Sequence, residues 1–257
     1  MKQFDLNCDM GESFGAWRMG RDAEVMPHIT SANVACGLHA GDPSVMMATV
    51  KLARQWGVSV GAHPGFPDLQ GFGRRAMRMR AEEIRGFVLY QIGALWAVAR
   101  AAGVDLFHVK PHGALYNVAA KDRSVAQPIA QAIADFSREL RLYCLPSSEL
   151  EAAGIECGLK TIAEGFVDRA YEPSGSLVDR DQAGAVAGET AHAVRQALML
   201  ARGEVMCRDG SLLKLEVGTL CVHGDTPGAP EIAREVNAAL RAEGYTLAAP
   251  STATNGR

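Results

Sequence analysis

The chain of 257 residues contains no long apolar run, because no segment approaches the roughly 20 consecutive apolar residues that a membrane-spanning helix needs. Charged residues precede the first apolar run, so we expect no secretory signal. The net charge of −3 gives no general attraction for nucleic acid or for an acidic membrane. These absences predict a cytoplasmic protein that binds neither nucleic acid nor a membrane.

The chain also lacks the glycine-rich signatures of common nucleotide sites. No GxGxxG run follows the first candidate strand, and no GxxxxGK[ST] phosphate loop occurs. Cysteine is scarce, with six residues and no CxxC pair. In a chain of this length we interpret them as buried thiols in a reducing compartment. An open dinucleotide-binding sheet is therefore disfavoured.

What is present is an alternation of short apolar strands with longer helical patterns, which is typical of parallel strands with helices packed outside. Asp42 is expected to cap a helix over 43–56 that Gly57 ends, and Asp209-Gly210 predicts a hairpin over 204–214. Other helices are expected at 81–102, 122–138, 182–202 and 230–243. The candidate strands are 3–8, 30–36, 58–62, 106–110, 141–145, 159–164 and 215–222.

We find no linker or internal repeat, so the sequence predicts one α/β domain. The length suits a single-domain β/α barrel of the TIM-like kind, whose wall the seven candidate strands would form. We expect this barrel to occupy residues 1–248. The small polar tail, 249–257, is expected to be flexible.

Strand parity predicts a polar barrel interior, because side chains alternate between the two faces of a strand. In the first strand Asp5, Asn7 and Asp9 share one face, and the apolar residues share the other. Polar groups inside a barrel are costly unless they are hydrogen-bonded or hydrated. We therefore expect a functional interior that opens at the carboxyl ends of the strands, where barrel active sites lie. The same parity on other strands leads to Asn33, His39, His63, Lys110, His112, His223 and Asp225.

Several of these residues have an alternative structural interpretation. Asp9 and Glu12 could ligate a metal or exchange protons, but an Asp after a strand also caps turns. His39 could be an ordinary loop residue. A lysine inside a strand is seldom buried without a partner, and Asp9 is one conceivable partner for Lys110 across the barrel. His108 lies deeper and could be a hydrogen-bonded core histidine.

The loop after the third strand ends in Arg74-Arg75, and such a long loop is often functional. Arg74 could clamp a carboxylate or phosphate, whereas Arg75 is better explained as solvated. Asp168 and Arg169 follow the sixth strand. Histidines and carboxylates that converge could bind a divalent metal, although no HxxxH spacing supports this.

Six segments that carry the residues named above, taken together, resemble the LamB/YcsF family, whose members are A subunits of 5-oxoprolinase. The resemblance departs mildly at Leu38, where an aromatic residue is expected, and at Val178–Arg180, where a Val-Pro-Arg type sequence is expected. It spans residues 5 to 228 in order. The segments that carry it are DLNCDMGE (5–12), SANVACGLHAGDP (31–43), GAHPGFPDLQGFGRR (61–75), VKPHGALYN (109–117), AEGFVDR (163–169) and CVHGDTPG (221–228).

The resemblance implies a barrel related to glycoside hydrolases and polysaccharide deacetylases. It further implies ATP-dependent opening of the lactam ring of 5-oxo-L-proline to L-glutamate, in a complex with B and C subunits. Mg²⁺ would accompany the ATP. Because the chain lacks a phosphate loop, ATP is handled either by a partner or by an unfamiliar site that uses Arg74 or Lys110.

Within this hypothesis Asp9 is a general base or a ligand to a metal-bound water, and Lys110 stabilises an oxyanion. The candidate catalytic residues are Asp9, His63, Lys110 and His112, and an open alternative is a metal site at Asp9, His39 and His63. Two other functions remain: a metal-dependent deacetylase or amidohydrolase that needs no ATP, and a non-catalytic carrier of 5-oxoproline. The candidate substrate-binding residues are Asn7, Asn33, His39, Arg74, Glu164, Arg169, His223 and Asp225.

Overall fold

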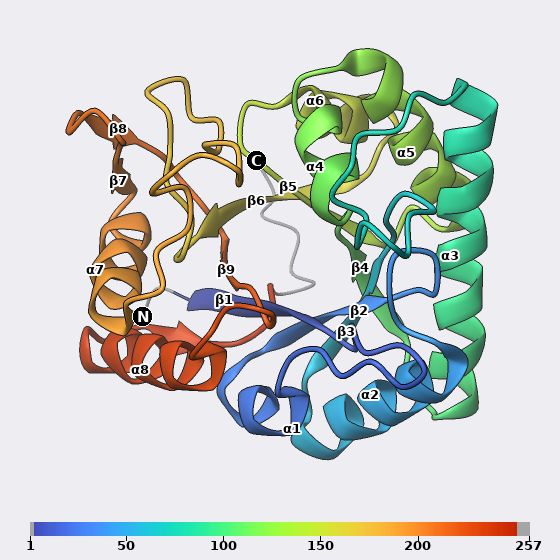
Figure 1. Ribbon diagram of the computed structural model, residues 1–257, viewed down its shortest axis with the longest axis horizontal. Helices are drawn as coiled ribbons and strands as arrows, with labels where there is room; N and C mark the ends of the chain where they lie inside the picture. Colours follow the sequence, from blue (N-terminus) through green and yellow to red (C-terminus); the bar gives the residue numbers. More distant parts are fainter. Residues whose placement is uncertain (1–2, 251–257) are drawn as a thin grey trace.

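The fold is a closed barrel of parallel strands with helices around it, seen in a computed structural model that describes residues 3–250 (Figure 1). Each strand pairs with the next along the chain, and the last pairs with the first to close the barrel. The predicted single-domain β/α barrel with seven wall strands is therefore confirmed. Its strands are β1 (Gln3–Met10), β2 (Ser31–Ala35), β3 (Ser59–His63), β4 (Leu106–Val109), β5 (Arg141–Cys144), β6 (Lys160–Phe166) and β9 (Thr219–Val222).

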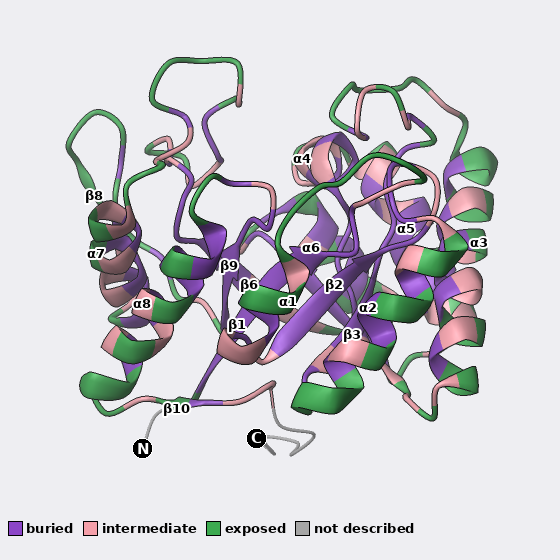
Figure 2. Ribbon diagram, turned by 60° about the horizontal axis from the view of Figure 1, so that its bottom comes forward, coloured by how far each residue is buried: buried purple, intermediate pink, exposed green. Residues whose placement is uncertain are grey.

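Helices cover the outside of the wall, and their outward faces are exposed while the strands are buried (Figure 2). The short β10 (Thr246–Leu247) extends the sheet beside the start of β1, and β7 (Glu204–Met206) with β8 (Leu212–Lys214) forms the predicted hairpin. No helix in the described residues combines the length and apolar character that crossing a membrane requires. The helices are α1 (Asp22–Val25), η1 (Met26–His28), α2 (Pro43–Trp56), α3 (Ala81–Ala101), α4 (Gly113–Ala119), α5 (Arg123–Phe136), α6 (Glu149–Glu156), α7 (Thr190–Ala201) and α8 (Ala229–Ala242).

Local sequence sets the helix ends as expected in α2. The Asp42 side chain accepts hydrogen bonds from the backbone N–H groups of Ser44 and Val45, at 2.8 and 3.0 Å. Pro43 occupies the first turn, where its missing N–H costs nothing. Gly57 ends the helix in the left-handed region at φ 67°. Asp42 is thus a helix cap, as predicted.

The helix expected over 182–202 begins only at Thr190. The preceding residues form a loop whose backbone groups bond to other parts of the rim, because Ala170 N–H donates to Ala185 O and Ala187 N–H donates to Asp168 O, each at 3.0 Å. Two glycines in this stretch lower its helix propensity further. Tertiary hydrogen bonds therefore replace the helical ones. Of the tail predicted to be flexible, residues 251–257 lie outside the described residues.

The predicted strand parity is confirmed in β1. Leu6 and Cys8 pack in the apolar core between the wall and the helices. Asp5 and Asn7, on the opposite face, form hydrogen bonds across the barrel to Tyr143 of β5 and to Glu164 of β6 respectively. The wall is thus apolar outside and polar inside.

Gly61 of β3 is needed because the His108 ring lies directly against its backbone, where a Cβ atom would overlap the imidazole. Gly61→Ala should therefore destabilise the fold by about 1–3 kcal/mol through overpacking. Denaturant unfolding measures this. The matched control is Gly86→Ala, on the exposed side of α3, where a Cβ meets nothing within 4 Å and a gain of up to about 1 kcal/mol is expected. Equal effects of the two substitutions would contradict the packing argument.

Candidate active site

The centre of the site is the ammonium group of Lys110, which is buried inside the barrel just beyond the end of β4. Its Nζ lies 2.9 Å from Asp9 Oδ1, 2.9 Å from Glu164 Oε1 and 2.9 Å from Cys221 Sγ. The Phe166 ring lies 5.2 Å from the same nitrogen. The ammonium therefore donates hydrogen bonds to Asp9 and Cys221 and forms an ion pair with Glu164, and the lysine joins β1, β6 and β9 across the barrel axis.

The charges in this group stabilise one another. Burial by itself would lower the pKa of Lys110, but the carboxylates of Asp9 and Glu164 hold it well above its usual range. Burial would likewise raise the pKa of Asp9, but His63 and Lys110 hold it well below its usual range. Both groups are therefore charged at neutral pH. The partnership between Asp9 and Lys110 expected from parity is present in the structure.

Below Lys110 the interior is filled by a hydrogen-bonded network. Asn33 donates to Asn7 Oδ1 at 2.7 Å and to Asp9 Oδ1 at 2.8 Å, and its own carbonyl oxygen lies 2.6 Å from His108 Nε2. His108 also stacks on Tyr143, with ring centroids 4.1 Å apart. Asn7 and Asn33 therefore fix the orientation of Asp9 from beneath.

Asp5 lies deeper still and is surrounded by hydroxyl groups. Its carboxylate accepts hydrogen bonds from Thr30, Ser31, Tyr143 and Thr219 at 2.6 to 2.9 Å. Burial nevertheless raises its pKa, although these four bonds act in the opposite direction. Hydroxyl donors thus satisfy a carboxylate that forms no ion pair within residues 3–250.

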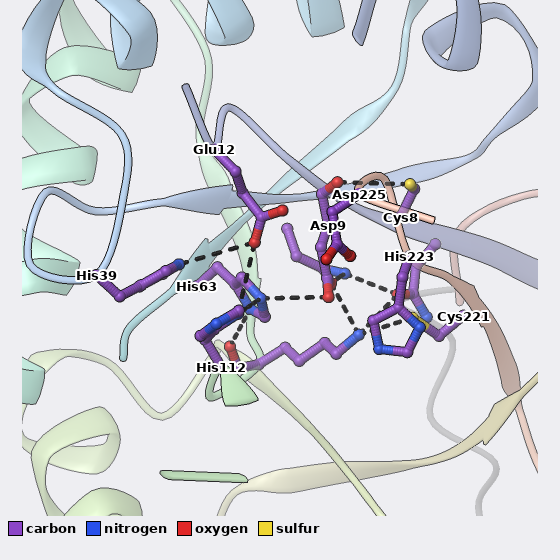
Figure 3. A network of polar contacts seen from close by, with 12 residues as sticks. Cys8, Asp9, Glu12, His39, His63, His112, Cys221, His223 and Asp225 are labelled. Carbon is purple, nitrogen blue, oxygen red and sulfur yellow. Dashed lines mark hydrogen bonds and ion pairs between the residues drawn. The ribbon is translucent and has the colours of Figure 1, made fainter. Parts of the chain in front are cut away.

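Three histidines gather on one side of Asp9 (Figure 3). His63 Nε2 lies 3.4 Å from Asp9 Oδ2 and 3.0 Å from His112 Nδ1. His39 stacks on His112 with centroids 3.9 Å apart. Glu12 Oε1 approaches His112 Nδ1 at 3.5 Å and His39 Nε2 at 3.9 Å. We call Glu12, His39, His63 and His112 the histidine cluster.

Glycines in the loop after β3 allow this close packing. A Cβ at Gly65 would lie 2.5 Å from His39 Nδ1, and one at Gly73 would lie 2.8 Å from His39 Cβ and 2.9 Å from His112 Cδ2. Gly73 also has φ 63°, which disfavours other residues. The glycine-rich loop therefore encloses the imidazoles with backbone instead of side chains.

A fourth histidine lies on the other side of Asp9 and has a carboxylate partner. His223 Nδ1 lies 2.8 Å from Asp168 Oδ1, and Thr226 donates to Asp168 Oδ2 at 3.0 Å. No hydrogen bond within the described residues engages His223 Nε2. Burial would raise the pKa of Asp168, but His223, Arg180 and Thr226 lower it to about 2. Asp168 thus fixes the histidine ring in the way that orienting carboxylates do in acid–base sites.

Arginines lie around the mouth of the barrel. Arg74 forms an ion pair with Asp225 at 2.5 Å, joining the loops after β3 and β9. Arg169 is buried, and its Nη2 donates to Val178 O at 2.6 Å, which holds the loop before α7. Burial, aided by Arg180, lowers the pKa of Arg169 to about 10. Arg180 has neither a hydrogen bond nor an ion pair within the described residues.

A cavity of about 650 Å³ opens above Lys110. It is large enough for a small-molecule site. A second hollow, of about 330 Å³, borders Glu12 and His39 on their outer side. The polar residues that line the first cavity include Asp9, His63, Arg74, Lys110, His112, Asn117, Lys121, Arg169, Arg180 and His223.

Most of the residues singled out in the sequence converge here, but they occupy different positions. Asp9, His63, Lys110, His112, Arg74, Arg169 and His223 line the cavity. Asn7, Asn33 and Glu164 lie beneath it, His39 lies behind His112, and Asp225 pairs with Arg74.

Sequence reasoning gave no role to Asp168, Tyr143 or Arg180. Asp168 shares the strand parity of the inward Glu164, a signal that could have identified it. No periodic pattern marks Arg180, because it lies in an irregular loop.

Comparison with known proteins finds close relatives over almost the whole chain. The model of the LamB/YcsF family matches residues 4–255. The 5-oxoprolinase A subunit of Symbiobacterium thermophilum is 53% identical over 251 residues, which cover 97% of this chain and 96% of that protein. The same-named protein of Pyrococcus abyssi is 50% identical over 244 residues, 95% of this chain and 96% of its own length.

A solved structure also matches closely. The crystal structure of the lactam utilization protein from Thermus thermophilus superposes with a TM-score of 0.91 at 46% identity, covering 96% of this chain and 99% of that one.

Replacing Lys110 by an uncharged residue should reveal how much unpaired buried carboxylates lower the free energy of unfolding. Lys110→Met leaves Asp9 and Glu164 without their cation, and we expect a loss of about 3–5 kcal/mol in unfolding free energy. The double variant Lys110→Met/Glu164→Gln should recover part of this. As control, Arg100→Met breaks an exposed pair with Asp105 and should cost at most about 1 kcal/mol. Urea unfolding measures all three, and a single variant as stable as the control would refute this account of Lys110.

The depressed pKa of Asp168 predicts a pH-dependent stability difference. A carboxyl with a folded pKa of about 2, below its ordinary 3.8, stabilises the fold above pH 3.8 and loses that contribution as pH falls towards 2. Asp168→Asn should therefore cost about 2 kcal/mol at neutral pH. The difference from the unmodified protein should vanish between about pH 4 and pH 2. Unfolding measured across this range checks the prediction, and a difference independent of pH would contradict it.

Proposed function

We propose that this chain, which belongs to the LamB/YcsF family, acts in 5-oxoproline metabolism as the A subunit of a multi-subunit 5-oxoprolinase. In this proposal it opens the lactam ring of 5-oxo-L-proline to give L-glutamate, and the complex consumes ATP. The observation that carries it is the 53% identity, over 97% of the chain, to a protein named as the A subunit of 5-oxoprolinase. The ionisable groups around the cavity supply the chemistry that ring opening requires.

An unstrained five-membered lactam resists hydrolysis, so coupling to ATP is chemically reasonable. Transfer of the γ-phosphoryl group to the lactam oxygen gives a better electrophile. Water then adds to the lactam carbonyl carbon that bears this oxygen. The C–N bond of the ring breaks, and the nitrogen takes a proton and becomes the amine. The resulting acyl phosphate is hydrolysed by a second water to glutamate and phosphate. Proton acceptors and donors near one carbon are needed for each step.

The residues around the cavity suit these steps. Asp9 is ionised, and Lys110 and Asn33 occupy its Oδ1, so Oδ2 is the oxygen that accepts a proton from the attacking water. We assign to His223, which Asp168 orients, the role of donating the proton to the ring nitrogen. The charge of Lys110 stabilises the developing oxyanion from beneath.

The substrate carboxylate requires a cation to bind it. Among the arginines that line the cavity, we assign this role to Arg180. Its guanidinium is not engaged elsewhere in residues 3–250, whereas Arg74 and Arg169 already bind Asp225 and Val178 O. A guanidinium binds a carboxylate through two parallel hydrogen bonds.

ATP with its Mg²⁺ belongs, in this proposal, to the B and C subunits. The chain has no phosphate loop to cradle a triphosphate. A phosphorylated substrate would then be handed to the cavity of this chain.

Reconstitution tests the proposal directly. Glutamate release from 5-oxoproline should need ATP and all three subunits, and this chain alone should give none. Asp9→Asn should lower the turnover of the complex by about 10²–10⁴-fold, because it removes the proton acceptor while keeping the shape. Co-purification checks that the variant still assembles.

Asp105→Asn, a control on an exposed aspartate before β4, should leave turnover unchanged. Near-normal turnover by Asp9→Asn would exclude the catalytic role and favour a non-catalytic carrier.

A second candidate is a metal-dependent deacetylase or amidohydrolase that works without ATP, and the histidine cluster is the observation that favours it. Such an enzyme would hydrolyse an N-acyl substrate without partners and would lose activity on chelation. Activity of the isolated chain without ATP would therefore replace the first proposal by the second.

A further inference from the structure

We propose that the histidine cluster, Glu12 with His39, His63 and His112, binds one divalent cation of the zinc type. The four side chains are buried, and one ligand atom from each lies within 4.8 Å of all the others. They come from four separate segments that meet at the carboxyl ends of β1 to β4. The site does not depend on the proposed function, because cation binding can be measured without any substrate.

The first argument concerns the protons of His63 and His112. His63 Nδ1 lies 2.7 Å from the carbonyl oxygen of Lys110, and His112 Nε2 lies 2.8 Å from that of Phe72. A carbonyl oxygen only accepts hydrogen bonds, so each of these nitrogens carries the ring proton. In the neutral rings the other nitrogens, His63 Nε2 and His112 Nδ1, are lone pairs, and they face each other at 3.0 Å. Two facing lone pairs repel unless a positive charge lies beside both, either a proton that the two nitrogens share or a bound cation.

The second argument concerns spacing. Glu12 Oε1 lies 3.5 Å from His112 Nδ1 and 3.9 Å from His39 Nε2, and it has no hydrogen-bond partner in residues 3–250. Contacts of this length are long for hydrogen bonds. Two ligands bound tetrahedrally at zinc distances are about 3.4 Å apart. The separation of Glu12 Oε1 from His112 Nδ1 is therefore that of two ligands which share one ion, and the 3.0 Å between the His63 and His112 nitrogens is somewhat shorter.

Burial and missing partners support this interpretation. Glu12 is buried, and its Oε1 has no hydrogen-bond partner within residues 3–250. A carboxylate oxygen buried in this way is in an unfavourable environment, which a cation beside it would offset.

The four ligands should not contribute equally. The His39 and His112 rings are stacked with only 5° between their planes. An imidazole binds metal in its ring plane, so two parallel rings cannot both direct a lone pair at one point. His112 and His63 are fixed by backbone carbonyls, whereas neither nitrogen of His39 has a partner in the described chain. His63, His112 and Glu12 therefore form the essential set, and His39 must rotate to join them.

The donor set also selects the class of ion. Three imidazole nitrogens and one carboxylate suit Zn²⁺, Fe²⁺, Co²⁺ or Ni²⁺, whereas Mg²⁺ and Ca²⁺ prefer oxygen ligands. The proposed ion is thus different from the Mg²⁺ that would accompany ATP.

The test is cation binding by the full chain after treatment with chelator and dialysis. Zn²⁺ titration against a chromophoric chelator should give one tight site, and Co²⁺ should give the visible absorption of tetrahedral coordination. His112→Ala and Glu12→Gln should each weaken Zn²⁺ binding by about 100-fold or more, since loss of a group that only orients a metal ligand already costs up to that much. His39→Ala should weaken it less.

His192→Ala is the matched control, on a partly exposed histidine of α7, and should bind like the unmodified protein. Circular dichroism shows whether each variant is folded, and the isosteric Glu12→Gln keeps the test valid if His112→Ala is not. Failure to take up Zn²⁺ would mean that His63 and His112 share only a proton, and it would overturn the proposal. Equal binding of Mg²⁺, or no effect of Glu12→Gln, would overturn it as well. None of these outcomes depends on 5-oxoproline turnover.

Discussion

The ion pairs of the buried Lys110 are the interaction on which the rest of the site depends. Its ammonium contacts Asp9, Glu164 and Cys221, which belong to three different strands. A charge removed from water costs several kcal/mol unless it is paired and hydrogen-bonded, so the loss of any one partner weakens the joining of these strands. Lys110 thereby decides which oxygen of Asp9 is occupied and which faces the cavity.

The remaining polar interior follows from the same requirement. Buried polar groups need partners, and beneath the cavity the barrel supplies them in successive levels along its axis: hydroxyls around Asp5, amides around Asn7 and Asn33, and charges around Lys110. The apolar contribution to stability comes from the outer face of the wall, where Leu6 and its neighbours pack on the helices. This separation lets the interior be polar without loss of a core.

Much of this arrangement could be predicted from the sequence because strand parity is a local property. The inward direction of Asp5, Asn7 and Asp9, and the partnership of Lys110 with Asp9, needed only alternation and a closed wall. The loop before α7 could not be predicted, since its helix-like sequence is overridden by hydrogen bonds to distant residues such as Asp168. Nor could the partners of each histidine, because they depend on tenths of an ångström between separate loops.

Those partners divide the imidazoles on the two sides of Asp9 into two kinds. His223 bonds to the carboxylate of Asp168, which orients the ring as in acid–base sites. His63 and His112 bond to neutral backbone carbonyls, which fix the tautomer without adding negative charge. A carbonyl that accepts the proton of one ring nitrogen leaves the other nitrogen directed into the histidine cluster, which is how a metal-binding histidine is oriented. The same residue type therefore suits two chemistries within one barrel mouth, and Asp9 lies between them, with Oδ1 held by Lys110 and Oδ2 3.4 Å from His63 Nε2.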